Sequence, residues 1–305
     1  MQIHVGGHMH YNSTTITPSN DGTNHLINIQ APSIAAYVPA YKLMTLDNSD
    51  TVKVETVVLE DVRGYDELFE HYEQEYQVAE TFKEGKPWDY NILDAKSYVE
   101  MNDYHIQGLT KFKWLGNWPG VAAPVLQNIS GSQMLILSQL ETDITLCELS
   151  QIIDLPGNHD ECLERYGLSD QWMKDWNTAT IKAQQFAREN NQSLNEFTWS
   201  GLDMATGFYR LRNADELAIE YGHTFEDYIP QYALVSKALS EMDVNILDEV
   251  GSEHPVGDAF KKEFGIIFTV AQMLYDRAPS NDFLIDRATG AVSDMSGTIY
   301  RPDYQ

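Results

Sequence analysis

The sequence predicts an α+β fold in which an N-terminal β-meander is followed by a mostly helical region. Residues 1–62 contain short runs of β-branched and aromatic residues separated by Gly, Pro, Asn and Asp. After Arg63 the apolar residues change to helical spacing. The chain has 305 residues, which is long enough for one large domain or two ordinary ones. We therefore expect two parts, a β segment over residues 1–62 and a mainly helical domain over residues 63–305.

Four runs within the first part have the composition of β-strands. They are Ile3–Val5, Leu26–Ile29, Tyr41–Leu46 and Val52–Leu59. In the last run, apolar residues alternate with Lys53 and Glu55, which predicts that one face of this strand is buried. We expect the strands to form a meander, in which each strand pairs with its neighbours in sequence.

The first expected helix follows directly. Its apolar residues recur at helical spacing with glutamates between them, and the pattern ends near Gly85. These apolar residues are Tyr65, Leu68, Phe69, Tyr72 and Tyr76. From residue 88 to residue 155 the pattern is mixed, and Met134–Leu137 is interpreted as either a short strand or a buried helix.

The remainder is expected to be mainly helical. Ser169, Ser200 and Asn213 are placed as N-caps of three helices, because their side chains can accept hydrogen bonds from a first helical turn. A clear apolar stripe runs from Phe260 to Leu274, and residues 283–292 are expected to form a small hairpin.

The chain is strongly acidic, with a formal net charge of −26. We therefore expect neither nucleic acid nor an anionic membrane as a partner, because both would be repelled. The acidic residues are interpreted as a solvated surface. The alternative is an interaction protein whose carboxylates imitate the phosphates of DNA. The sequence contains no apolar stretch of the roughly 18 residues that a transmembrane helix needs.

The two cysteines, Cys147 and Cys162, do not form a Cys-x-x-Cys pair, so a zinc ribbon is excluded. They are either two buried thiols or, in an exported protein, one disulfide. The N-terminus has neither the basic nor the apolar region of a signal peptide. We expect a periplasmic or secreted location if an upstream segment supplies a signal, and a cytoplasmic location otherwise.

Two histidines, His8 and His10, follow the first expected strand, directly after Gly6 and Gly7. Side chains two residues apart point to the same side of a strand, so both imidazoles are expected to face one site as the strand becomes a loop. Neutral imidazole is a good ligand for zinc, manganese, iron or nickel. The alternative is a pair of ordinary surface histidines. His4 is expected to have a structural role.

The Gly-His-x-His motif and the order of strands after it resemble the end of the catalytic domain of calcineurin-like metallophosphoesterases. The resemblance covers roughly residues 1–62. It implies a binuclear centre of two divalent ions (manganese, iron, zinc or nickel), in which His8 ligates one ion and His10 the other. It also implies metal-assisted hydrolysis of a phosphate ester, a small molecule.

A second fragment, Gly157-Asn158-His159-Asp160, resembles the middle motif of the same family and follows the apolar pair Ile152-Ile153, where the family has a strand. The resemblance implies that Asn158 is a metal ligand and His159 a general acid. The alternative is a Pro-Gly-Asn turn before an acidic helix start. In the family this motif precedes the Gly-His-x-His motif, whereas here it follows it.

The other family motifs are missing or misplaced. The sequence has no Gly-Asp-x-x-Asp, which supplies the aspartate that bridges the two ions, and its nominal Asp-x-His at Asp103 does not end an apolar strand. A looser likeness links residues 202–218 to the C-terminal region of some large exported bacterial members. We therefore expect the C-terminal portion of such an enzyme, whose remaining ligands lie on an upstream or separate segment.

Three consequences follow from this expectation. The isolated chain should retain little metal and hydrolyse no ester. Its β-meander should have an unpaired edge, used for self-association or covered by residues 63–155. Two rival hypotheses stay open, a non-enzymatic acidic interaction protein of the DNA-mimic type and a complete but permuted phosphoesterase.

Overall fold

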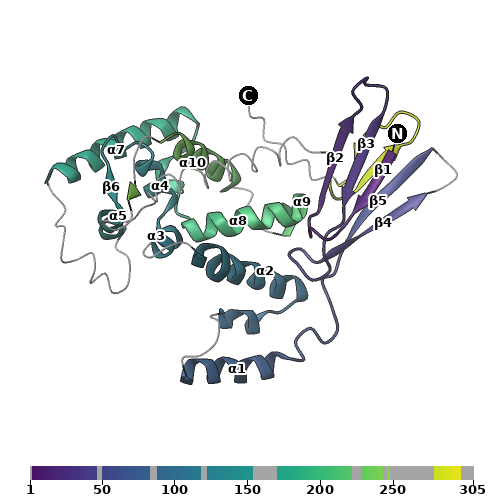
Figure 1. Ribbon diagram of the computed structural model, residues 1–305, viewed down its shortest axis with the longest axis horizontal. Coiled ribbons are helices and arrows are strands. Elements are labelled where there is room, and N and C mark those ends of the chain that lie inside the picture. Colours follow the sequence, from purple (N-terminus) through teal and green to yellow (C-terminus); the bar gives the residue numbers. More distant parts are fainter. Residues whose placement is uncertain are drawn as a thin grey trace. The chain divides into compact units, whose positions relative to one another are not determined.

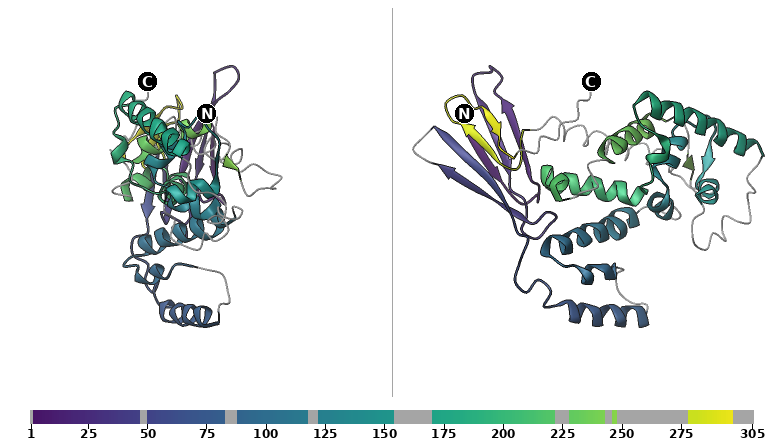
Figure 2. Two further views of the ribbon diagram at one scale, coloured as in Figure 1. Left: turned by 90° about the vertical axis from the view of Figure 1, so that its left-hand side faces the viewer. Right: turned by 180° about the vertical axis from the view of Figure 1, so that it is seen from behind.

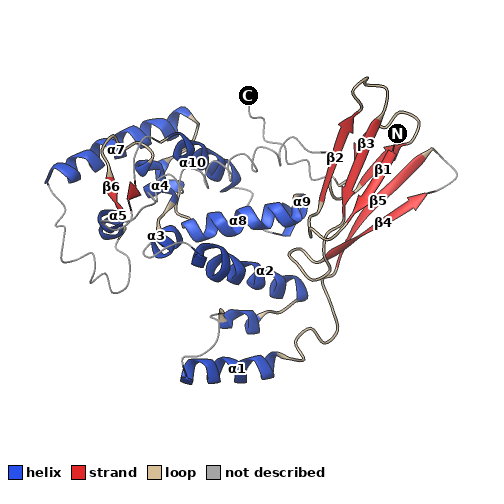
Figure 3. Cartoon of the chain, viewed as in Figure 1, coloured by secondary structure: helices blue, strands red, loops and turns tan. Residues whose placement is uncertain are grey.

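The computed structural model confirms the α+β class, with strands gathered at the N-terminal end of the chain and helices after them (Figure 1, Figure 3). The structure describes residues 2–46, 50–82, 88–117, 122–153, 170–221, 228–242, 246–247 and 278–296. The chain divides into two compact units. The first comprises residues 1–112, 207–226 and 273–305, and the second comprises residues 113–206 and 227–272. The boundary expected after residue 62 stays a prediction.

The first sheet contains β1 (Gln2–Gly6), β2 (Ser13–Pro18) and β3 (His25–Gln30), in the order β1-β3-β2. The strand β3 is central, parallel to β1 and antiparallel to β2. The expected meander is therefore wrong at this point, because β1 and β3 are parallel and because β3 and β4, which were expected to pair, lie in different sheets. We also missed β2, an edge strand whose residues 15–18 are exposed and therefore show no alternation of apolar and polar positions.

The second sheet is antiparallel and has the order β4-β5-β8-β9. Its strands are β4 (Ala40–Leu46), β5 (Thr51–Val58), β8 (Phe283–Asp286) and β9 (Val292–Asp294). The hairpin expected near the C-terminus is thus confirmed, and in Figure 2 its yellow strands lie among the N-terminal strands. The strand β8 pairs with β5 on the side away from β4, so the C-terminal hairpin covers that edge of β5. The expected unpaired edge, used for self-association or covered by residues 63–155, stays a prediction.

The two sheets share one apolar core. Ile27 and Ile29 of β3, Val52 and Val54 of β5, and Phe283 and Ile285 of β8 are each at most 1% exposed and form a single cluster. Alternate residues of a strand point to opposite faces, so each of these three strands contributes one buried face. The C-terminal hairpin is therefore part of the core of the first unit.

The helices of the first unit include α1 (Phe69–Phe82), the 3₁₀ segment η1 (Tyr90–Asp94), α2 (Tyr98–Gly108) and α9 (Glu216–Tyr221). The expected amphipathic helix is α1, which packs Tyr76 edge-on against Trp88 and Tyr90. Two of its other large apolar side chains, Tyr72 and Phe82, are 40% and 66% exposed. A π-helical segment, η2 (Leu109–Trp114), continues α2.

The second unit is mainly helical and contains α4 (Gly131–Leu137), so the apolar run Met134–Leu137 is a buried helix. The other elements are α3 (Ala122–Asn128), α5 (Leu146–Ile152), α7 (Asp170–Glu189), α10 (Ile229–Glu241), the 3₁₀ segments η3 (Leu115–Asn117) and η4 (Leu194–Glu196), and the short parallel pair β6 (Ile144–Thr145) and β7 (Ile246–Leu247). Trp199 is buried and donates from Nε1 to Gln231 Oε1 at 2.7 Å. In the described part of the chain, no helix combines the length and apolar character needed to cross a membrane.

The helix α8 (Gly201–Ala214) begins as expected, because Ser200 and Asp203 exchange side-chain and backbone hydrogen bonds at its N-terminus. The cap expected at Asn213 is wrong. Asn213 lies inside α8, and the break before α9 is at Asp215, whose φ is +51°. Ser169 and the stripe Phe260–Leu274 lie outside the described residues.

Candidate functional site

The histidine motif forms an exposed loop between β1 and β2. The strand β1 ends at Gly6, so strand alternation does not orient His8 and His10 as the sequence suggested. Both residues instead adopt the left-handed conformation, with φ of +73° and +58°, and both are exposed. This conformation costs a side-chain-bearing residue roughly 1 kcal/mol, and such residues are concentrated at functional sites. Within the described residues, neither imidazole takes part in a hydrogen bond or an ion pair.

The loop is anchored by Asn12, which is fully buried. The backbone N–H of Asn12 donates to the carbonyl of Asn213 at 2.7 Å. Its side-chain Nδ2 donates to the carbonyl of Ala214 at 3.1 Å and to Asn281 Oδ1 at 2.8 Å. These bonds hold the residues directly after His10 against the C-terminal end of α8.

Of the four site residues that the resemblance implies, the structure describes only His8 and His10. Asn158 and His159 lie outside the described residues, as does Cys162, and the side chain of Cys147 is also outside them. The strand expected at the apolar pair Ile152-Ile153, before the second motif, is wrong. Ile152 ends the helix α5 and Ile153 lies in a turn. The Thr145 capping box starts that helix and explains why its apolar residues are helical.

Other histidines in the described ranges do not add ligands to the loop. His4 on β1 shares a 2.7 Å hydrogen bond between its Nδ1 and Asn28 Oδ1 on β3, in line with the structural role expected for it. His71 pairs with Glu75 on α1. In the ranges that the structure describes, no group of three or more His, Cys, Asp or Glu side chains could hold a metal ion. His8 and His10 therefore do not fit a complete binuclear centre on their own.

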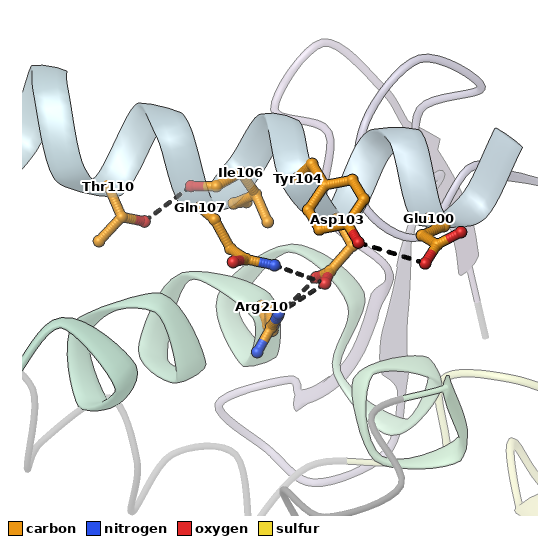
Figure 4. A network of polar contacts seen from close by, with 7 residues as sticks. All are labelled: Glu100, Asp103, Tyr104, Ile106, Gln107, Thr110 and Arg210. Atoms are coloured by element: carbon orange, nitrogen blue, oxygen red, sulfur yellow. Dashed lines mark hydrogen bonds and ion pairs between the residues drawn. The ribbon is translucent and has the colours of Figure 1, made fainter. Parts of the chain in front are cut away.

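Asp103, the aspartate of the nominal Asp-x-His motif, lies on α2 and forms an ion pair within the protein. Its carboxylate accepts hydrogen bonds from Arg210 Nε at 2.7 Å and Nη2 at 2.6 Å, and another from Gln107 Nε2 at 2.8 Å (Figure 4). The guanidinium of Arg210 also lies over the ring of Tyr37 at 5.7 Å. Asp103 thus joins α2 to α8 by a two-bond ion pair and is not available as a metal ligand.

A buried polar cluster was not recognised from the sequence. Lys42 on β4 donates from Nζ to Thr56 Oγ1 at 2.6 Å and to the carbonyl of Ser280. Burial lowers the pKa of Lys42 to about 7, although Glu216 and the carboxylates of Asp282 and Asp215 oppose the shift.

Glu216 lies on the other side of the same cluster. It accepts the backbone N–H groups of Ser280 at 3.2 Å and Asn281 at 3.0 Å. Burial raises the pKa of its carboxyl group. The cluster connects β4, β5 and α9 to the segment that enters β8. The Lys42 amine therefore stabilises the fold. In the sequence, the cluster is indicated only by a lysine at an inward position of β4. This lysine could not be assigned to a cluster without knowing that the distant segment at Ser280 packs beside it.

Comparison with known proteins identifies no relative, since no family model, curated protein or solved structure matches the chain.

Proposed function

We propose that this chain supplies part of the active site of a metal-dependent phosphoesterase, in which His8 and His10 are two of the metal ligands and the substrate is a small phosphate ester. One observation supports this most strongly. Two exposed imidazoles lie in left-handed positions directly after the first strand, and among the described residues neither has a protein partner. A strained loop that presents two unengaged imidazoles is suited to bind a borderline divalent metal ion.

The remaining ligands of a binuclear centre are not found among the described residues, and we propose that they come from another segment or another chain. The two rival hypotheses remain. A permuted complete enzyme requires Asn158 and His159, which the structure does not describe. An acidic interaction protein is compatible with the net charge of −26 and with the exposed apolar face of α1.

Nickel binding followed by NMR tests the proposal. Nickel prefers imidazole to the many carboxylates of this acidic chain, and it broadens the signals of nearby nuclei. We expect the ring signals of His8 and His10 to broaden first and together. The variants His8→Ala and His10→Ala should each weaken this binding by about tenfold or more.

The matched control is His71→Ala, which removes an exposed imidazole on α1 that already pairs with Glu75. This variant should leave nickel binding at the loop unchanged. If His71 broadened at the same nickel concentration as His8 and His10, the two histidines would not form a joint site and the proposal would fail.

A further inference from the structure

We propose that Arg212 binds the phosphate group of the substrate beside the His8–His10 loop, and that free phosphate and phosphate monoesters share this oxyanion site. The identity of the anion rests on the function proposed above. The location of the site rests on separate observations at the end of α8.

Arg212 is positioned by two aromatic rings. Its Cζ lies 4.7 Å from the ring centre of Tyr11 and 5.9 Å from that of Tyr209. Tyr11 directly follows His10, and the hydrogen bond from Asn12 N–H to the Asn213 carbonyl holds the two segments side by side. The guanidinium therefore lies next to the loop that presents the two imidazoles.

A guanidinium over a ring face is held by cation–π attraction, while its N–H groups remain directed outward in the plane of the group. Such a planar fork of donors matches two oxygens of a phosphate group. Arg212 is only partly buried, so a ligand can reach it from solvent.

Arg212 belongs to an acidic chain, in which 46 acidic residues face 20 basic ones. Arg210, two residues earlier on the same helix, forms an ion pair with Asp103. Lys111 and Lys182 also pair with carboxylates. Arg212 forms no ion pair with any described carboxylate, so its positive charge is available for an external anion.

A competing explanation is that Arg212 only stabilises the end of its helix, because a cation in the last turn interacts favourably with the helix dipole. Arg188 provides the matched comparison. It is the basic residue in the last turn of α7, it is exposed, and its Nε donates to the carbonyl of Gln184 in its own helix. Dipole stabilisation applies equally to both arginines, whereas the proposed oxyanion site applies only to Arg212.

The test is a titration of the metal-free protein with inorganic phosphate at constant ionic strength, followed through the Nε–Hε NMR signals of the arginines. A second arm uses methyl phosphate in place of inorganic phosphate. We expect a saturable shift of the Arg212 signal in both arms, with the Arg188 signal unmoved. The variant Arg212→Gln should weaken phosphate binding by about tenfold, the usual scale for a lost charged hydrogen bond, and Arg188→Gln should not change it.

An Arg212 signal that stays unmoved, or that shifts no more than that of Arg188, would overturn the inference. A response to inorganic phosphate alone would identify a free-phosphate site and contradict a shared site for esters. Both arginines are read in one spectrum of the wild-type protein, so the result stands even if a variant does not fold. Because no metal is present, failure here is distinct from failure of nickel to bind His8 and His10.

Discussion

Lys42 illustrates how a single buried side chain couples the fold to pH. Its pKa of about 7 lies below the ordinary value of 10.5 because burial disfavours the charged amine. Between these values the unfolded chain holds a proton that the folded chain has released. Folding stability should therefore rise with pH across this window, by at most about 1.4 kcal/mol per pH unit.

The variant Lys42→Met tests this coupling, because methionine has a similar length and cannot titrate. We expect the stability advantage of the wild type over this variant to grow as the pH is raised from about 7 towards 10, measured by urea unfolding at several pH values. The variant Lys53→Met is the matched control, since it removes a lysine that is 42% exposed on the adjacent strand. If the stability difference between the wild type and Lys42→Met stayed constant with pH, burial would not lower the pKa of the Lys42 amine.

The residues of the candidate site could be predicted only in part. Local sequence located His8 and His10 directly after a strand, because the glycines and the apolar run are visible in a few residues. It could not locate Lys42 or Arg212 in a site. Their partners are respectively 238 and 201 positions away in the chain, at Ser280 and Tyr11, and no local period indicates such a contact.

At the scale of elements, the hairpin β8–β9 is the most informative part of the fold. It pairs with β5 through the register Val52↔Ile285 and Val54↔Phe283, although more than 200 residues separate the strands. The ring of Phe283 is fully buried in the core that the two sheets share. The hairpin should therefore contribute to the stability of the N-terminal strands.

The variant Phe283→Ala should destabilise the protein by about 3–5 kcal/mol, the usual cost of removing a buried aromatic side chain from a packed core. Chemical unfolding followed by circular dichroism would measure it. Leu43→Ala, at a position 48% exposed on β4, is the control and should cost far less. A loss below about 1 kcal/mol for Phe283→Ala would mean that the hairpin does not share this core.

Element types were predicted better than element partners. The four strands, the amphipathic helix α1 and the C-terminal hairpin follow from periodicity and turn residues, because these patterns are local. The sheet order did not follow, because pairing depends on contacts between distant segments. The apolar pair Ile152-Ile153 was predicted as a strand because a short apolar run is compatible with a strand or a helix. The capping box at Thr145 starts a helix that extends to Ile152.

At the scale of the whole molecule, the net charge of −26 and the two presented histidines lead to different expectations about metal. An acidic surface attracts divalent ions weakly and without selectivity. A catalytic metal site instead requires three or more protein ligands at one point, and the loop offers two candidate ligands, His8 and His10. We propose that this chain contributes two ligands to a phosphoesterase centre and does not complete it.

Metal content and ester hydrolysis, measured on one preparation of the full chain, test this claim most directly. After extensive dialysis we predict well under one equivalent of bound metal by elemental analysis. With added manganese we predict no hydrolysis of a chromogenic phosphate monoester or diester above background. Two retained equivalents, together with turnover that falls at least about a hundredfold in both His8→Ala and His10→Ala, would contradict the claim and identify the chain as a complete enzyme.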